Sequence, residues 1–161
     1  MKIIALPFAG GNKYSFNLLT KELIKNSISL DVIEYPGRGQ RFQEKFLEST
    51  LEIVDDVINK LIEKKIDSEY IIYGHSMGAL IGYLVCQKLE GLKIHKPMKL
   101  IVSGRVAPSI LKDRKTNQLP SKEFWEEINK LGGMPNDILK EKELKDFFEP
   151  ILGSSTKLVE F

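Results

Sequence analysis

The chain has 161 residues, 42% of them hydrophobic and 29% charged, so it can form one globular domain with a buried core rather than a disordered segment. Its 24 basic and 22 acidic residues leave a formal net charge of +2, which gives no support to nucleic acid or a membrane as a partner. The single cysteine excludes an internal disulfide, residues 1–4 do not resemble a signal peptide, and no apolar run approaches the roughly 20 residues of a membrane span, so we expect a cytoplasmic protein.

Apolar runs alternate along the chain with segments of helical period, which predicts an α/β fold around a parallel sheet. The predicted strands are 3–6, 30–33, 70–73 and 100–102. The predicted helices are 14–25, 49–64, 77–89, 121–131, 136–148 and a last one from Pro150, because proline fits a first helical turn. In the first helix one face carries the apolar residues Phe16, Leu19, Leu23 and Ile24. In the second, Ser49 and Glu52 have the spacing of a capping box.

The pattern changes after the fourth predicted strand. Residues 105–120 are polar and basic, and the two amphipathic segments after them do not continue the alternation of strand and helix. We predict that residues 105–149 form a helical insertion within a single domain that spans 1–161. Five apolar side chains of this insertion have two interpretations: they line a pocket, or they pack the helices that carry them into an apolar core. The second interpretation is favoured for these residues, which are Phe124, Trp125, Leu131, Phe147 and Phe148.

The pentapeptide Gly74-His75-Ser76-Met77-Gly78 stands between the third predicted strand and the helix that follows it. A serine hydroxyl is a poor nucleophile unless a strained turn holds it clear of its own backbone, beside a base and oxyanion donors. The strand before Ser76, the helix after it and the two flanking glycines are what such a turn requires. We therefore predict Ser76 as a nucleophile. The alternative is a glycine-rich turn with a solvated serine.

Two backbone N–H groups are expected to bind the oxyanion that a serine nucleophile generates. The N–H of Met77 lies at the positive end of the following helix and is placed to donate. A second donor should come from the loop after the first strand, residues 7–12, where glycines let the backbone approach a substrate. Ala9 or Phe8 would supply it. The alternative is a glycine-rich turn that only joins a strand to a helix.

Three motifs follow one another in the order Leu6-Pro7-Phe8-Ala9-Gly10-Gly11, Tyr35-Pro36-Gly37-Arg38-Gly39 and Gly74-His75-Ser76-Met77-Gly78-Ala79. In this order they resemble the opening loop, the second-strand loop and the nucleophile elbow of the external, type II thioesterases of non-ribosomal peptide and polyketide synthesis (NRPS/PKS), which belong to the α/β-hydrolase superfamily. Residues 119–135 and the predicted helix after them are similar to the lid of these enzymes. The resemblance spans essentially the whole chain.

The resemblance implies an α/β-hydrolase fold, with helices flanking the parallel sheet and an inserted helical lid. It implies hydrolysis of aberrant acyl or aminoacyl groups from the phosphopantetheine arm of carrier protein domains, through an acyl-enzyme on Ser76. Backbone N–H groups of Met77 and Ala9 would hold the oxyanion. The substrate carries the phosphopantetheine, so no separate cofactor is expected. No metal is expected either, because two histidines and one cysteine do not have the spacing of a zinc site.

The chain departs from the family in its catalytic base. The superfamily places an acid and then a histidine after the serine, and the chain has only two histidines. His75 lies inside the turn with its side chain leaving in another direction, and His95 precedes the fourth strand, at the edge of the sheet opposite Ser76. In the family the acid and histidine follow later strands, beyond a position that corresponds to Phe161. We therefore expect an amino-terminal portion of a longer enzyme, inactive or weakly active by itself, with its C-terminal strands missing and one edge of the sheet unpaired.

Charged residues in two loops have two interpretations. Arg38 and Arg105 follow strands, at the edge where open α/β sheets bind ligands, but a solvated loop charge is the favoured interpretation for both. Between Arg105 and Lys122 the chain carries five basic residues against one acidic residue. This segment could attract an acidic carrier protein, and it is equally well a solvated loop.

Two further functions remain open from the sequence. One is an esterase or lipase of the same fold that acts on free small molecules, since the elbow alone does not distinguish it. The other is a non-catalytic module that binds a carrier protein, which the missing histidine supports. Cys86 is expected to be a small buried apolar residue rather than a reactive thiol.

Overall fold

A computed structural model of the chain describes residues 1–66, 68–107, 110, 116–132 and 134–159. Its four strands form one parallel sheet in the order β2-β1-β3-β4. The strands are β1 (Lys2–Leu6), β2 (Ser29–Val32), β3 (Tyr70–His75) and β4 (Lys99–Ser103). The four predicted strands and the parallel sheet are confirmed, with ends that differ by one or two residues.

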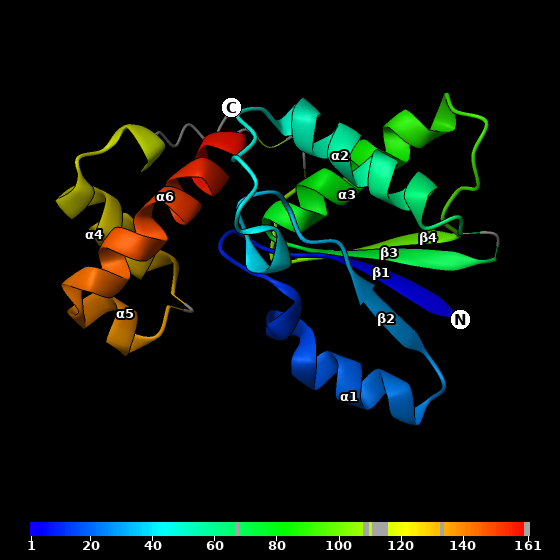
Figure 1. The fold of residues 1–161 in the computed structure, drawn as a ribbon, viewed down its shortest axis with the longest axis horizontal. Coiled ribbons are helices and arrows are strands. Elements are labelled where there is room, and N and C mark those ends of the chain that lie inside the picture. The colour runs from blue at the N-terminus through cyan, green and yellow to red at the C-terminus, as the bar shows by residue number, and fades with distance from the viewer. Residues whose placement is uncertain (67, 108–109, 111–115, 133, 160–161) are drawn as a thin grey trace.

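Helices cover both faces of this sheet, as predicted. Helices α2 (Thr50–Glu63) and α3 (Met77–Glu90) lie on one face and α1 (Asn17–Lys25) on the other (Figure 1). Short 3₁₀ turns are η1 (Lys13–Phe16), η2 (Gly39–Arg41) and η3 (Thr116–Gln118). The predicted start of the first helix is therefore a 3₁₀ turn, because Asn12 caps η1 by accepting from the N–H of Tyr14 at 2.9 Å. The capping box of α2 is confirmed: Ser49 Oγ accepts from Glu52 N at 3.2 Å, and Glu52 accepts from Ser49 N at 2.9 Å.

The core is dense on only one face of the sheet. Side chains of β1 and β3 pack there against α2 and α3, and the fully buried members include Ile4, Leu6, Ile53, Val57, Ile72, Ile81 and Val85. On the other face α1 buries none of its residues: Leu18 is 80% exposed and Ile24 is 64% exposed. Of the apolar face predicted for this helix only Phe16, in η1, is buried. β4 is the outermost strand among the described residues, and its Val102 is 54% exposed.

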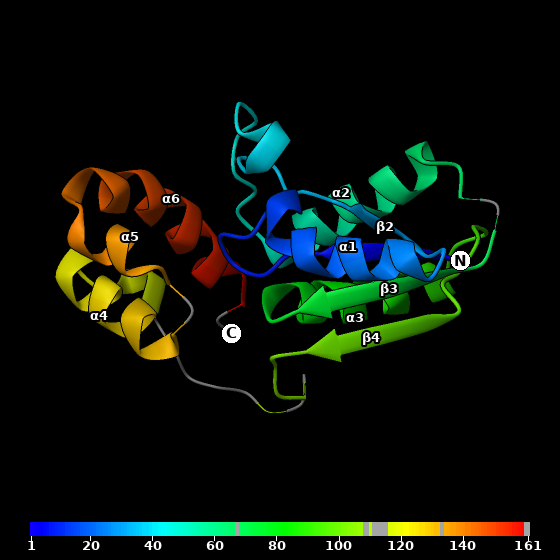
Figure 2. The same cartoon turned by 90° about the horizontal axis from the view of Figure 1, so that it is seen from below.

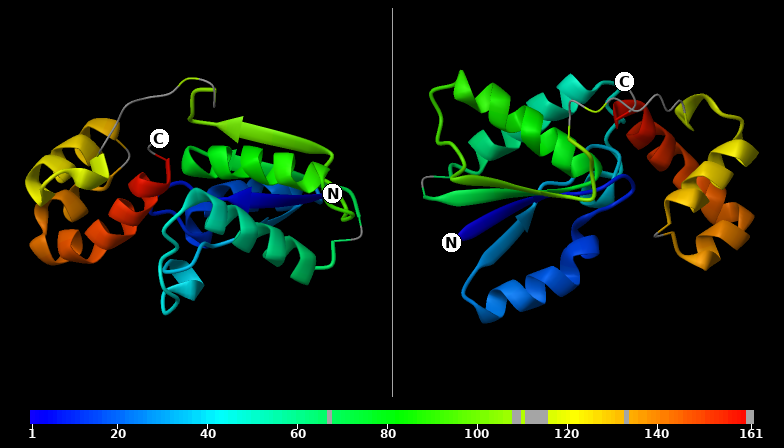
Figure 3. Two further views of the ribbon diagram at one scale, coloured as in Figure 1. Left: turned by 90° about the horizontal axis from the view of Figure 1, so that it is seen from above. Right: turned by 180° about the vertical axis from the view of Figure 1, so that it is seen from behind.

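The predicted insertion forms a separate helical lid, composed of α4 (Ser121–Leu131), α5 (Asn136–Lys140) and α6 (Lys142–Val159). The strands β3 and β4 point toward it, so the lid lies beyond the carboxyl ends of the sheet (Figure 2), and Figure 3 shows the same separation from two further sides. The lid has its own apolar cluster, made of Phe124, Trp125, Ile128 and Leu152.

Two predicted boundaries in the lid are wrong. The helix predicted over 136–148 is interrupted at Glu141, whose φ of −92° and ψ of 119° are extended, so α5 and α6 are separate. No helix begins at Pro150, because α6 runs through this residue and carries the lid past residue 149. The lid cluster includes Leu152 and has Phe148 packed against it, so apolar contacts hold α6 on both sides of the proline. None of the helices in the described ranges is long and apolar enough to cross a bilayer.

Candidate active site

Ser76 is the single residue between β3 and α3, and its backbone is strained. Its φ of 52° and ψ of −110° lie in a region that residues with a side chain rarely adopt. Hydrogen bonds fix the main chain on both sides: Ser76 N donates to Ser103 O at 2.9 Å, and Ala79 N donates to Ser76 O at 3.1 Å. The Ser76 side chain makes no capping bond to α3, so its hydroxyl is not tied to the backbone of the helix that it precedes.

The two glycines of the pentapeptide are required by space. A Cβ on Gly74 would overlap the carbonyl of Gly78, and a Cβ on Gly78 would overlap the carbonyl of Leu6. The two sides of the turn are therefore in backbone contact with each other and with the end of β1. This geometry explains why the pattern has glycine two residues before and two residues after Ser76.

The predicted oxyanion donors come from segments that lie side by side. The N–H of Met77, at the first position of α3, has no partner within its own helix. Leu6 pairs with Gly74 in the parallel register, so the loop 7–12 leaves the sheet next to the elbow. Its turn is formed by Gly11 N donating to Phe8 O at 2.9 Å, with Gly10 at a φ of 75°. The assignment of Met77 and Ala9 as oxyanion donors stays a prediction that this placement supports.

His75 is held beside the elbow as a structural residue, as predicted. Its Nδ1 lies 2.8 Å from Ser103 Oγ, and its ring makes an edge contact with Phe8 at 5.7 Å between centroids. The ring also covers Gly104, which has a φ of 66° and where a Cβ would overlap it. These contacts hold the imidazole against Ser103, Gly104 and Phe8.

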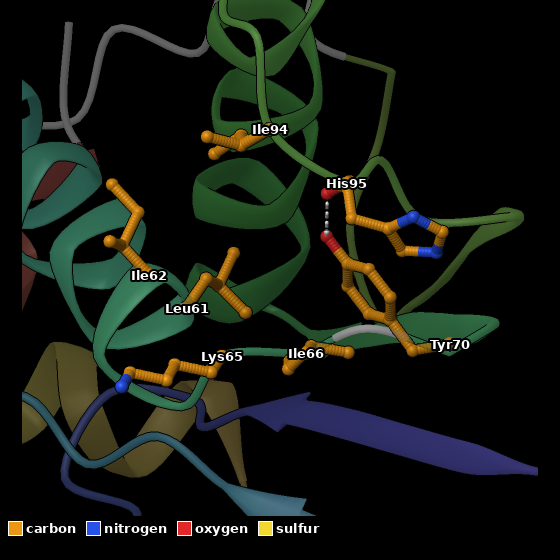
Figure 4. Close-up of a pocket in the computed structure, with 7 residues that line it drawn as sticks. All are labelled: Leu61, Ile62, Lys65, Ile66, Tyr70, Ile94 and His95. Carbon is orange, nitrogen blue, oxygen red and sulfur yellow. Dashed lines mark hydrogen bonds between the residues drawn. The ribbon is translucent and has the colours of Figure 1, made fainter.

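His95 lies at the opposite end of β3. The Tyr70 hydroxyl donates to the His95 carbonyl at 3.1 Å, and Tyr70 is the first residue of the strand that Ser76 follows (Figure 4). Six strand residues separate the two positions by roughly 20 Å. Around His95 is a pocket of about 240 Å³, lined by Leu61, Ile62, Lys65, Ile66, Tyr70, Ile94 and His95. His95 is therefore too far from Ser76 to act as its base.

Arg38 corrects a sequence-based expectation. We expected a solvated loop charge, but the side chain is only 3% exposed. Its guanidinium donates to Pro36 O at 2.8 Å and to Ser155 Oγ of α6 at 2.9 Å, and burial lowers the pKa of Arg38 to about 10. Arg105 is also partly buried, and burial lowers its pKa. Residues 112–115 of the basic segment lie outside the described residues.

The other side chains singled out in the sequence have mixed outcomes. Phe124 and Trp125 are buried in the lid cluster and Phe148 packs against it, whereas Leu131 is 60% exposed and Phe147 is 65% exposed. Cys86 is half-buried against the main core, and burial raises the pKa of its thiol.

Sequence analysis missed Glu34, a buried carboxylate two residues after the end of β2. It accepts from Lys13 N at 2.8 Å and from Gln40 N at 2.9 Å, so it ties together the loops that follow β1 and β2. A lone acidic residue between Ile33 and Tyr35, at the end of an apolar run, was the available signal. Within the described part of the chain, no group of three or more histidine, cysteine, aspartate or glutamate residues could hold a metal ion.

Comparison with known proteins agrees with this geometry. A family model described as a thioesterase domain matches residues 1–160. The chain is 34% identical over 160 residues to the thioesterase PikA5 of Streptomyces venezuelae. The matched region is 99% of the chain and 57% of PikA5. The crystal structure of ClbQ from the colibactin NRPS/PKS pathway matches with a TM-score of 0.89 and 28% identity, over 99% of the chain and 66% of ClbQ.

A more distant structure shows the fold alone. An extracellular α/β-hydrolase from a Paenibacillus species matches with a TM-score of 0.60 and 15% identity, over 94% of the chain and 65% of that protein. The chain thus spans between 57 and 66% of the length of these three proteins.

Proposed function

The chain belongs to the thioesterase domain family and has an α/β-hydrolase fold, and from this premise we propose that it serves thioester hydrolysis with Ser76 as the nucleophile. One observation carries the proposal. Ser76 stands alone at a φ of 52° between β3 and α3, at the edge of the sheet that faces the lid (Figure 2). This is the placement that an elbow nucleophile requires.

The proposed reaction has two halves. Ser76 Oγ attacks the thioester carbonyl carbon and gives up its proton to a base, and the N–H groups of Met77 and Ala9 stabilise the oxyanion. The C–S bond then breaks, and the thiol leaves with a proton. Water cleaves the acyl-enzyme in the second half. We propose that the base is neither His75, which is bonded to Ser103, nor His95, which lies at the far end of β3.

For the substrate we propose acyl or aminoacyl groups on the phosphopantetheine arm of carrier protein domains, which makes these domains the partners. Two relatives support this: one is named a thioesterase, and ClbQ comes from an NRPS/PKS pathway. The lid beyond the carboxyl edge of the sheet is a further support, since it could cover an acyl chain bound at Ser76. A cytoplasmic location is part of the proposal.

A second candidate is a module that binds a carrier protein without catalysis. The observation that favours it is the placement of the two histidines, one bonded to Ser103 and the other at the far end of β3. Losing the partners of a serine nucleophile costs on the order of 10⁴ to 10⁶ in kcat, so weak turnover and no turnover must be distinguished experimentally.

Covalent labelling of the 161-residue protein with a fluorophosphonate tests the nucleophile. Because neither histidine activates Ser76, we expect slow labelling: one phosphonyl adduct accumulates on Ser76 over long incubation, as found by peptide mass spectrometry, with no adduct in Ser76→Ala and an unchanged rate in His95→Ala. Acyl release should then be compared on acyl-carrier protein, acyl-coenzyme A and an oxygen ester. A preference for the carrier supports the proposal, and an equal rate on the oxygen ester supports a hydrolase of small molecules. Carrier binding without an adduct on Ser76 supports the non-catalytic module.

A further inference from the structure

Arg38 is a buried cation in the loop after β2, and two aromatic rings surround it. Its guanidinium carbon lies 5.9 Å from the centroid of Tyr35 and 5.3 Å from that of Phe46. Burying a charged side chain to 3% exposure costs free energy unless hydrogen bonds compensate for the lost water. The partners of Arg38 therefore show which contacts this residue stabilises.

Most of these partners belong to the lid. One terminal nitrogen donates to Pro36 O at 2.8 Å, within its own loop. The other lies 2.9 Å from Ser155 Oγ, 3.3 Å from Ser154 Oγ and 3.4 Å from Ile151 O, all on α6 and 113 to 117 residues away in sequence. Ser155 donates its own proton to Ile151 O at 2.8 Å, so its oxygen is free to accept from Arg38.

The same part of α6 presses on the loop that carries the predicted second oxyanion donor. Leu152 is buried against Gly10, where a Cβ would lie 2.9 Å from Leu152 Cδ2. A Cβ at Gly10 would make the end of the Leu152 side chain shift, and the φ of 75° at this position favours glycine as well. Leu152 and Ser155 are three residues apart on one helix, and they contact the two loops at once.

The two loops are themselves joined. Glu34 accepts from Lys13 N, just after the loop 7–12, and from Gln40 N, just after Arg38. Helix α6 also makes an exposed ion pair with the loop before α2, between Lys157 and Glu48 at 3.4 Å, which contributes little. Arg38 and Leu152 thus each give α6 a buried attachment to these loops.

We infer that Arg38 is a positioning residue that fixes the lid helix α6 against the loop 7–12, and thereby sets both the height of the lid above Ser76 and the place of the Ala9 N–H. We call the contact of Arg38 with Ser154, Ser155 and Ile151 the Arg38 clasp. Its effect on acyl transfer rests on the proposed function, whereas its effect on the lid does not.

Hydrogen exchange of the 161-residue protein tests the clasp without any need for turnover. In Arg38→Met, peptides from residues 142–157 should exchange at least about tenfold faster, since charge-assisted bonds are lost, while peptides from β1, β3 and α3 keep their rates. Lys157→Ala breaks the exposed ion pair of the same helix and is the matched control, with exchange close to wild type. Unchanged exchange of 142–157 in folded Arg38→Met overturns the inference.

A variant on the other side of the clasp covers the case in which Arg38→Met does not fold. Ser154→Ala combined with Ser155→Ala removes the two hydroxyl acceptors and leaves the loop 35–41 intact, and it should accelerate the same peptides. A folded double variant with wild-type exchange in 142–157 overturns the inference as well.

Comparing the labelling rates of a large and a small fluorophosphonate distinguishes a displaced lid from a general loss of stability. With the clasp lost, labelling of Ser76 by a long-chain alkyl fluorophosphonate should rise relative to labelling by diisopropyl fluorophosphate, because a displaced lid obstructs the bulky probe less. A global loss of stability would change both rates together and leave the ratio unchanged. An unchanged ratio with α6 released overturns the positioning role. If neither probe labels Ser76 of the wild-type protein even after long incubation, the proposed function fails, and the exchange experiment still decides the clasp.

Discussion

The sheet and the lid differ in how tightly their glycines are surrounded. Around the sheet, a Cβ on Gly37 would overlap the Phe46 ring, and one on Gly39 would overlap the Glu34 carboxylate, as happens at both glycines of the elbow. In the lid, apart from the adjoining backbone, none of the described atoms lies within 4 Å of the position that a Cβ would take at Gly132 or Gly153. The sheet with its loops is therefore fixed by steric contacts, whereas the lid has room for change.

This difference has a functional reason. A positive φ at a residue like Ser76 costs of order 1–3 kcal/mol, and it persists only where the surrounding structure holds it. The crowded sheet supplies that support to the predicted nucleophile. We expect the lid, whose Gly132 and Gly153 have open surroundings, to move without disturbing Ser76. The predictions below test whether the two regions are as different as their glycines indicate.

The largest effect is expected at Gly78. In Gly78→Ala the new Cβ would overlap the Leu6 carbonyl, which is backbone and has no room to move, so the elbow and the end of β1 separate or the chain does not fold. We expect a loss of at least about 4 kcal/mol in the free energy of unfolding, measured by urea titration with far-UV circular dichroism. A loss below about 1 kcal/mol would show that the sheet yields as easily as the lid.

Next in size is a matched pair of core truncations. Ile72 is fully buried in the main core and Phe124 is buried in the lid cluster. Ile72→Ala should lower the stability of the whole protein by about 2–5 kcal/mol. Phe124→Ala should cost the lid about 3–5 kcal/mol and leave the unfolding midpoint of the sheet near wild type.

The fluorescence of Trp125 reports unfolding of the lid separately from that of the sheet, since Trp125 is the only tryptophan and lies in the lid. Its fluorescence should lose cooperativity in Phe124→Ala while far-UV circular dichroism retains the main transition. Leu131→Ala, at an exposed position of the same helix, is the control and should stay within about 0.5 kcal/mol of wild type. Coincident transitions by both probes in Phe124→Ala would mean that the two regions unfold as one unit.

The same contrast explains what could be predicted from the sequence. The strands, the helix with its capping box and the turn at Ser76 depend on contacts within a few residues or on apolar periodicity, and these were predicted. The role of Gly74 and Gly78 followed from the shape of the turn. Local chemistry was sufficient wherever the backbone itself was the constraint.

Long-range contacts account for what was missed. The burial of Arg38 depends on serines of α6 more than 110 residues away, so a loop arginine resembled a solvated charge. Proline at position 150 predicts the start of a helix, but packing of the flanking residues holds α6 as one helix through it. The exposed apolar face of α1 is the opposite case, because periodicity predicted burial that the described residues do not provide.

The smallest effect is expected at Gly153, inside α6. A Cβ there meets no atom within 4 Å, and glycine in a helix interior is less favourable than alanine, so Gly153→Ala should stabilise the lid by about 0.5–1 kcal/mol. Gly132 is the matched control, since its surroundings are equally open but its φ is 73°. Gly132→Ala should destabilise the lid by roughly 1–3 kcal/mol through backbone strain alone, because a φ of 73° with a ψ of 179° lies in a region that essentially only glycine adopts. Both are read from Trp125 fluorescence during urea unfolding. If Gly153→Ala destabilises the lid as much as Gly132→Ala does, space around α6 is more restricted than its contacts indicate, and the lid resembles the sheet.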